Sequence, residues 1–264
     1  LSKGVNCRNF SSYIMKNNFD IMSSTHLREQ KSWEQQLQTT KNLGMKGIEL
    51  FGQEIFASDL KKIKNKNRRL NLILTAHPWF DFNQLEIKQA QNKFLEFLEV
   101  YIYLGVKIIN VHLNFFATPE TGVKRITEII NPIIPQLKQN DIKLVFENTP
   151  INGDNPLGSS PEHFENLFDL LENSSHIGFT LDTGHANISS SLHKFTDKLQ
   201  DKWIYTHLND NHGESDQHLG PGMGSINWRN FFSQIDRVNY NGYFIYEFPE
   251  KYLTKSINLM KSCF

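Results

Sequence analysis

The sequence predicts an α/β fold, a single-domain (β/α)8 barrel that spans residues 1–264. Short apolar runs typical of strands alternate with longer stretches of helical periodicity, and this alternation is typical of parallel α/β folds. A chain of 264 residues also suits one such barrel and is long enough to bury most of its apolar surface. Ionisable residues close nearly every predicted strand, at the end where barrel enzymes carry their active sites.

Eight segments are predicted to be strands. Seven are clear apolar runs, whereas the opening candidate near the N-terminus is weaker. In chain order they are Gly4–Asn6, Lys46–Phe51, Leu70–His77, Val106–His112, Ile142–Glu147, Ile177–Asp182, Trp203–His207 and Tyr243–Glu247. A buried strand that ends in a charged group is hard to explain by packing, because an unpaired charge is costly to desolvate.

Helical periodicity fills the gaps between these runs. Apolar side chains follow three-and-four spacing between Leu85 and Leu104, and Gly105 supplies a C-terminal stop. Ser160 followed by Pro161 predicts an N-cap and the first position of another helix. Strands and helices therefore alternate along the whole chain, as the barrel requires.

Composition limits the classes of partner. The 28 basic and 28 acidic side chains balance, so net charge gives no strong attraction to DNA or anionic lipid. Cys7 and Cys263 lie near opposite ends of the chain, which argues against a disulfide framework and a thiolate metal site. No apolar run approaches the roughly 18 residues of a membrane span, and no secretory leader opens the sequence. We therefore expect a cytoplasmic protein without a membrane partner.

Nine residues that can bind metal gather at or just after the predicted strand ends. They are His77, His112, Glu147, Asp182, His185, His207, Asp216, His218 and Glu247. One histidine after a strand is usually structural, but nine such groups at one predicted rim indicate a metalloenzyme. Imidazole and carboxylate ligands without cysteine suit zinc, manganese or another divalent ion, and the residue types do not choose among them.

The segments around these residues resemble one superfamily. They read Val-Phe-Glu147-Asn-Thr, Leu-Asp182-Thr-Gly-His185-Ala, Thr-His207-Leu-Asn-Asp-Asn, Asp216-Gln-His218-Leu-Gly-Pro-Gly and Tyr-Glu247. Together they resemble the xylose isomerase-like TIM-barrel superfamily over roughly Leu43 to Pro249. That superfamily includes sugar phosphate isomerases and epimerases and the endonuclease IV type of abasic-site nuclease, AP endonuclease family 2.

Resemblance to the isomerase and epimerase branch implies one divalent ion held by Glu147, Asp182, His207 and Glu247. The two glutamates would be catalytic, exchanging protons with opposite faces of a sugar or sugar phosphate. His185 would contact substrate oxygen, and Trp79 is a further candidate for substrate binding. Glycines 220, 222 and 224 follow the seventh predicted strand and could close over a sugar or a phosphate.

Resemblance to the nuclease branch implies that all nine residues hold a three-zinc cluster that cleaves duplex DNA at an abasic site. One to three ions per chain are therefore expected. Several details favour the isomerase branch, including the short stretch from His207 to Asp216, which has no arginine or lysine, and the ending Ser225–Trp228. A basic cluster, Lys61–Arg69, is expected at the opposite, amino-terminal face of the barrel. A barrel that keeps metal without catalysis is the third hypothesis, against which the two opposed glutamates argue.

Overall fold

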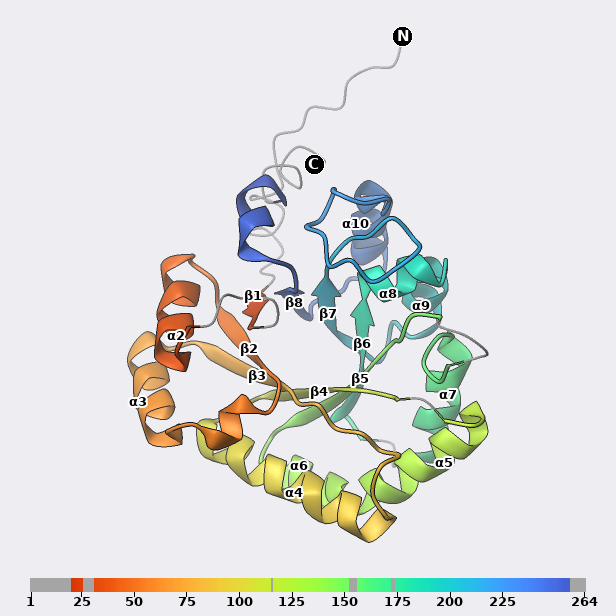
Figure 1. The fold of residues 1–264 in the computed structure, drawn as a ribbon. Coiled ribbons are helices and arrows are strands. Elements are labelled where there is room, and N and C mark those ends of the chain that lie inside the picture. The colour runs from red at the N-terminus through yellow and green to blue at the C-terminus, as the bar shows by residue number, and fades with distance from the viewer. Residues whose placement is uncertain (1–19, 26–30, 115, 152–155, 172–173, 257–264) are drawn as a thin grey trace.

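The protein is a closed barrel of eight parallel strands surrounded by helices, seen in a computed structural model (Figure 1). The structure describes residues 20–25, 31–114, 116–151, 156–171 and 174–256. Each strand pairs with its neighbours in sequence, and β1 closes the barrel against β8. The strands are β1 Asp20–Ser24, β2 Gly47–Phe51, β3 Ile73–His77, β4 Ile108–His112, β5 Lys143–Glu147, β6 Ile177–Asp182, β7 Trp203–Leu208 and β8 Tyr243–Tyr246.

Helices follow the strands and cover the outside of the barrel (Figure 1). They are α2 Trp33–Asn42, α3 Leu60–Leu70, α4 Ile87–Leu104, α5 Pro119–Ile130, α6 Ile134–Gln139, α7 Pro161–Leu170, α8 Thr183–Ile188, α9 Leu192–Lys198 and α10 Trp228–Arg237, with short 3-10 turns η1 Glu54–Ala57, η2 Asn131–Ile133 and η3 Glu250–Tyr252. The predicted (β/α)8 fold class is confirmed. The prediction of one domain over residues 1–264 extends beyond the described residues and stays a prediction.

The first strand differs from the sequence prediction. Asp20–Ser24 occupies the place between β8 and β2, whereas the predicted segment Gly4–Asn6 lies outside the described residues. The segment was missed because Asp20, Ser23 and Ser24 leave it only two apolar residues, Ile21 and Met22. Ser23 and Ser24 are nevertheless buried, so their polarity does not mark a surface loop here.

Two helix signals have different outcomes. Gly105 ends α4 in the left-handed conformation, with φ 81°, as its position predicts. Ser160 does precede α7 with Pro161 in the first turn, but its side chain makes no capping hydrogen bond.

The basic cluster Lys61–Arg69 lies along α3. Arg68 and Arg69, in the last turn of this helix, lie at the amino-terminal end of β3 as expected. Lys61 and Lys62 lie in the first turn, near the other rim, which corrects that part of the expectation.

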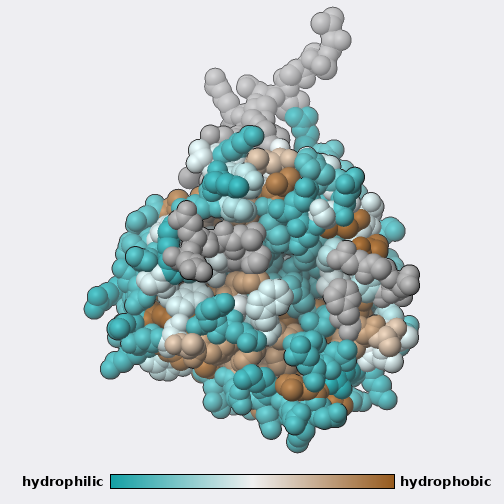
Figure 2. Space-filling view, viewed as in Figure 1, coloured by the Kyte–Doolittle hydropathy of each residue, from teal (hydrophilic) through white to brown (hydrophobic). Residues whose placement is uncertain are grey.

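The barrel has two apolar layers. Aliphatic and aromatic side chains fill the space between strands and helices, and a smaller cluster plugs the barrel interior with Met22, Ile108, Val145, Tyr205 and Ile245. Hydrophilic residues dominate the face drawn in Figure 2, where hydrophobic ones form small separate patches. In the part of the chain that the structure describes, no helix is long and apolar enough to cross a membrane.

Strand register brings the functional side chains to one rim. Parallel pairing sets Phe51 beside His77, His112 beside Glu147, and Asp182 beside His207. Side chains alternate between the two faces of a strand, so the residues two positions beyond the interior plug point into the barrel above it. The predicted ligands of adjacent strands therefore converge without any long loop.

Candidate metal centre

A buried group of carboxylates and imidazoles lies directly above the apolar plug of the barrel. Glu147, Asp182, His207 and Glu247 come from β5, β6, β7 and the end of β8, and at most 3% of any of them is exposed. Nδ1 of His207 lies 2.9 Å from Oε2 of Glu247 and 3.4 Å from Oε1 of Glu147. One potential ligand atom from each of the four residues lies within 4.8 Å of the others. This spacing suits one divalent ion.

A second group shares Glu147. Nε2 of His77 and Nε2 of His112 lie 3.6 Å and 3.5 Å from the same oxygen of Glu147, Oε2. The ligand atoms of these three residues again lie within 4.8 Å of one another. Glu147 therefore faces one potential ion with each oxygen, because its Oε1 points to His207.

The third group lies at the outer edge of the site, around Asp216. Oδ2 of Asp216 is 3.2 Å from Nε2 of His185 and 3.0 Å from Nε2 of His218. Nδ1 of His185 bonds the carbonyl of Asn148 at 2.8 Å, and Nδ1 of His218 bonds the carbonyl of Glu247 at 3.1 Å. These carbonyls can only accept, so they direct Nε2 of both rings toward Asp216.

Two unpaired nitrogen atoms test whether this cluster suits metal. Among the described residues, Nε2 of His77 and Nδ1 of His207 are buried and make no hydrogen bond of acceptable geometry. Buried polar atoms in folded proteins are normally satisfied, so unpaired ring nitrogens that face carboxylates need a partner. A divalent ion is such a partner, and the donor types fit one. Two of the three sets, the one around His207 and the one around His77, thus have ligand atoms close enough to hold an ion, and Asp216 joins His185 and His218 through two ion pairs. The assignment of the nine residues as ligands stays a prediction.

In the metal-free protein the pKa values of three histidines of the cluster are raised by the carboxylates around them. Burial lowers the pKa of His207 and His185, but the carboxylates around each ring, first Glu247 and Asp182 respectively, outweigh it and raise the pKa well above the ordinary value. Burial also lowers the pKa of His218, yet its bond to Asp216 and the charge of Glu247 raise it to about 9. His77 differs, because burial dominates and lowers its pKa to about 3.

The two glutamates proposed as catalytic have opposite shifts. Burial raises the pKa of Glu147, but the positive charges of His207 and His112 outweigh burial and hold the pKa well below its usual range. Burial dominates at Glu247 and raises its pKa, although His207 acts against this. In the metal-free site the pKa of Glu247 is therefore higher than that of Glu147.

Sequence reasoning missed three buried residues that hold the predicted ligands. Glu49 on β2 accepts from Nε2 of His207, Asn110 on β4 donates to Oε2 of Glu147, and Asn209 donates to Oδ2 of Asp182. Glu49 and Asn110 lie two residues before the last residue of their strands, so a search restricted to strand ends passes over them. The available signal was a charged or amide side chain within an apolar strand, which is costly to bury without partners.

The loop that carries Asp216 and His218 is fastened to one side chain. Asp210 is fully buried and accepts hydrogen bonds from the backbone of Asn211, Gly222 and Ile226 and from the indole of Trp228. Gly224 packs so closely on this residue that a Cβ would lie 2.4 Å from its Oδ1. Gly224 therefore serves close packing around Asp210, whereas Gly220 packs against Ser256 and Tyr252.

An open cleft of about 370 Å³ adjoins the cluster at His112. Gln53, Trp79, Asp81 and Asn114 are among its other lining residues, and Trp79 is 56% exposed. The ring of Trp79 packs edge-on against Phe51, with the ring centres 5.2 Å apart. The predicted substrate-binding residue thus borders the site, with its ring centre 6.2 Å from that of His112.

Comparisons with known proteins agree with this geometry. An uncharacterized protein of Methanocaldococcus jannaschii is 26% identical over 200 residues, which are 70% of this chain and 67% of that protein. A probable endonuclease 4 of Thermosipho melanesiensis is 29% identical over 141 residues, and the match spans 47% of this chain and about half, 49%, of the relative.

A solved structure of a D-tagatose 3-epimerase-like protein superposes with a TM-score of 0.77 at 21% identity, covering 93% of this chain and 97% of that one. At this identity the likeness shows a shared fold. A sequence profile described as xylose isomerase-like TIM barrel matches residues 37–263, which include all nine predicted ligands. The chain therefore belongs to the xylose isomerase-like TIM barrel family.

Proposed function

We propose that this protein is a divalent-metal-dependent enzyme that isomerises or epimerises a sugar or sugar phosphate. The observation that carries the proposal is the placement of Glu147 and Glu247. They leave strands three positions apart around the barrel and approach the same nitrogen of His207, with Asp182 beside them. Such a pair can reach a bound substrate from two sides.

The opposite pKa shifts suggest how the two glutamates divide the work. Glu147, held ionised, is suited to remove a proton from the carbon next to a carbonyl. Glu247, whose pKa is raised, is suited to return a proton to the same carbon from the other side in an epimerisation. In an isomerisation Glu147 would return its proton to the neighbouring carbon, while Glu247 would protonate the carbonyl oxygen and take the proton of the neighbouring hydroxyl. A divalent ion held by these two residues with Asp182 and His207 would polarise the carbonyl and acidify that carbon-bound proton.

Neighbouring side chains would keep both glutamates in position. Asn110 donates to Glu147 and is itself held by the hydroxyl of Thr180 at 2.8 Å. Because the carboxylates are nearly fully buried, bulk water has little access to the proton-transfer groups. The cleft beside His112 and Trp79 would then receive the rest of the sugar.

The charge of the rim favours a small substrate over a nucleic acid. The connections over residues 52–59, 78–86, 113–118, 148–160, 183–191 and 209–227 contain no lysine or arginine. Duplex DNA is bound largely through basic contacts to phosphates, so these six connections are poorly suited to that substrate. Lysines do lie elsewhere near this rim, at Lys31 in the connection after β1 and at Lys61 and Lys62 in the first turn of α3. A sugar needs hydrogen-bonding groups, which the asparagines and histidines of this rim supply.

Abasic-site DNA cleavage is the second candidate, and a specific observation favours it. The His77 and Asp216 groups extend the four-residue centre to the nine residues of the predicted three-metal cluster. Adjoining metals can clamp the attacking and leaving oxygens of a phosphodiester. One of the matched relatives is also named a probable endonuclease 4.

One paired assay separates the two candidates. Protein loaded with zinc or manganese, with its metal content measured, is incubated with ketoses and their phosphates and, separately, with a duplex that contains one abasic site. We expect conversion of a sugar that is lost in Glu147→Gln and retained in Glu250→Gln, an exposed glutamate just beyond Glu247. Metal-dependent nicking of the duplex without any sugar conversion would replace the first proposal with the second.

A further inference from the structure

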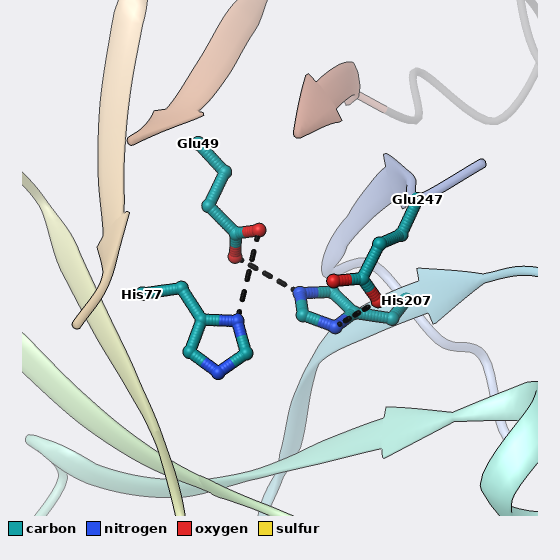
Figure 3. A group of neighbouring side chains, drawn as sticks. All are labelled: Glu49, His77, His207 and Glu247. Carbon is teal, nitrogen blue, oxygen red and sulfur yellow. Dashed lines mark hydrogen bonds and ion pairs between the residues drawn. The ribbon is translucent and has the colours of Figure 1, made fainter. Parts of the chain in front are cut away.

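We propose that Glu49 is a positioning residue that orients His207 toward metal at the centre. Figure 3 shows Glu49 reaching one side of the His207 ring while Glu247 lies at the other. Glu49 is fully buried on β2, and its Oε2 lies 2.9 Å from Nε2 of His207. This inference rests on the metal centre within the proposed function, and it is independent of the sugar reaction.

The hydrogen bonds around Glu49 fix the direction of each donor. An ionised carboxylate only accepts, so both of its partners must donate to it. They are Nε2 of His207 and the hydroxyl of Tyr205, each 2.9 Å from Oε2. Tyr205 can then accept from the hydroxyl of Thr75, which is 2.6 Å away. This series of hydrogen bonds keeps a proton on Nε2 of His207 and leaves Nδ1 available to bind a metal ion.

The reserved nitrogen is the one that faces the centre. Nδ1 of His207 lies near Glu147, Asp182 and Glu247, at 3.4, 3.9 and 2.9 Å, and makes no hydrogen bond of acceptable geometry with a described residue. Carboxylates that accept from the far nitrogen of a ligand histidine fix its tautomer and raise its basicity. Glu49 is such a carboxylate, because it accepts a hydrogen bond from Nε2, the far nitrogen of His207.

Glu49 also faces a histidine of the second group. Its other oxygen, Oε1, is buried and lies 3.9 Å from Nδ1 of His77, whose Nε2 points toward Glu147. This separation is too long for a hydrogen bond, so the coupling is electrostatic and weaker than that to His207. One carboxylate thus stands behind histidines of two adjoining groups.

A direct ligand role for Glu49 fits the geometry less well. Glu49, His77, His207 and Glu247 do offer ligand atoms within 4.8 Å of one another. Nδ1 of His207 lies 2.9 Å from Glu247 without the alignment of a hydrogen bond. The equally short contact between Nε2 of His207 and Oε2 of Glu49 has that alignment. An ion between these two atoms is therefore disfavoured.

The test measures metal affinity in Glu49→Gln. Competition with a chromogenic chelator gives the zinc affinity, elemental analysis gives the number of ions at saturation, and the visible spectrum of the cobalt-loaded protein reports ligand geometry. We expect about a 10- to 100-fold loss of affinity, an unchanged number of ions and a shifted cobalt spectrum. Unchanged affinity, or the loss of one ion equivalent at saturation, would overturn the inference.

Two further variants separate positioning from general disruption of the interior. Tyr205→Phe removes one donor to Glu49 and should lower zinc affinity by about 2- to 10-fold, which also tests the inference should Glu49→Gln fail to fold. Thr75→Val changes a buried hydroxyl that bonds Tyr205 rather than His207, and should leave affinity unchanged. Equal losses in Thr75→Val and Tyr205→Phe would refute a specific role for Glu49. If Glu147→Gln loses zinc while Glu49→Gln does not, the inference fails and the metal centre stands.

Discussion

The lower and upper halves of the barrel interior are built from the same strands and differ completely in chemistry. Ile108, Val145 and Ile245 belong to the apolar plug, while Asn110, Glu147 and Glu247, each two residues further along, face the centre above it. Along each strand the two layers are therefore two residues apart. The difference teaches that packing and chemistry are assigned to successive inward positions of one strand, so substitutions in the two layers should have separable effects.

The largest expected effect is on turnover in the upper layer. Glu147→Gln and Glu247→Gln each remove a proton-transfer group and should lower kcat by about 10²- to 10⁴-fold. Circular dichroism and thermal unfolding should show a folded barrel, because the side-chain volume is kept. Metal content is measured on each variant, so that loss of metal is distinguished from loss of proton transfer. Near-normal turnover in either variant would remove that residue from the mechanism.

Truncating a side chain in the lower layer should instead lower the stability of the fold and leave metal binding intact. Ile245 is fully buried in the plug, and Ile245→Ala should lower the free energy of unfolding by about 2–5 kcal/mol through lost burial and a residual cavity. Denaturant titration measures that loss. The folded fraction should bind metal with the affinity of the wild type. A variant that stays fully stable but cannot bind metal would contradict the separation of the two layers.

Changing the pH should alter the stability and the metal binding that depend on the titratable side chains of the upper layer. Because the pKa of His218 is raised to about 9, its stabilising charge is fully present below its unfolded value of about 6.5 and is lost as pH rises through 9. The metal-free protein should therefore lose stability between about pH 6.5 and 9, while metal binding strengthens as protons leave. The difference in Tm between metal-loaded and metal-free protein should widen over this range. A difference that is constant with pH would argue against histidine ligands.

The smallest effect is expected at the edge of the cleft. Trp79 packs on Phe51 and borders the cleft, and the centre of its ring lies 6.2 Å from that of His112. Trp79→Ala should raise KM for the sugar several-fold by removing apolar contact, with kcat nearly unchanged. Steady-state kinetics make the comparison, and Leu85→Ala, another exposed apolar residue outside the cleft, is the control. A large fall in kcat in Trp79→Ala would place this side chain closer to the chemistry.

Sequence periodicity predicted the barrel and seven of its strands, because buried parallel strands are strongly apolar and stand out between helical stretches. It failed at β1, where Ser23 and Ser24 are buried polar residues. All nine predicted ligands lie around one rim, since parallel strands bring their carboxyl ends together. The side chains that hold those ligands, such as Glu49 and Asn110, could not be assigned without the register that sets neighbouring strands side by side.

Solvent exchange is the most direct test of the central claim. The metal-loaded protein is incubated in D2O with ketoses and their phosphates, and mass spectrometry and NMR locate any deuterium. Proton transfer by Glu147 and Glu247 predicts deuterium on the carbon next to the carbonyl in at least one sugar, and none with Glu147→Gln. Fully metal-loaded protein that exchanges no carbon-bound proton of any sugar, yet nicks abasic DNA, would contradict the account.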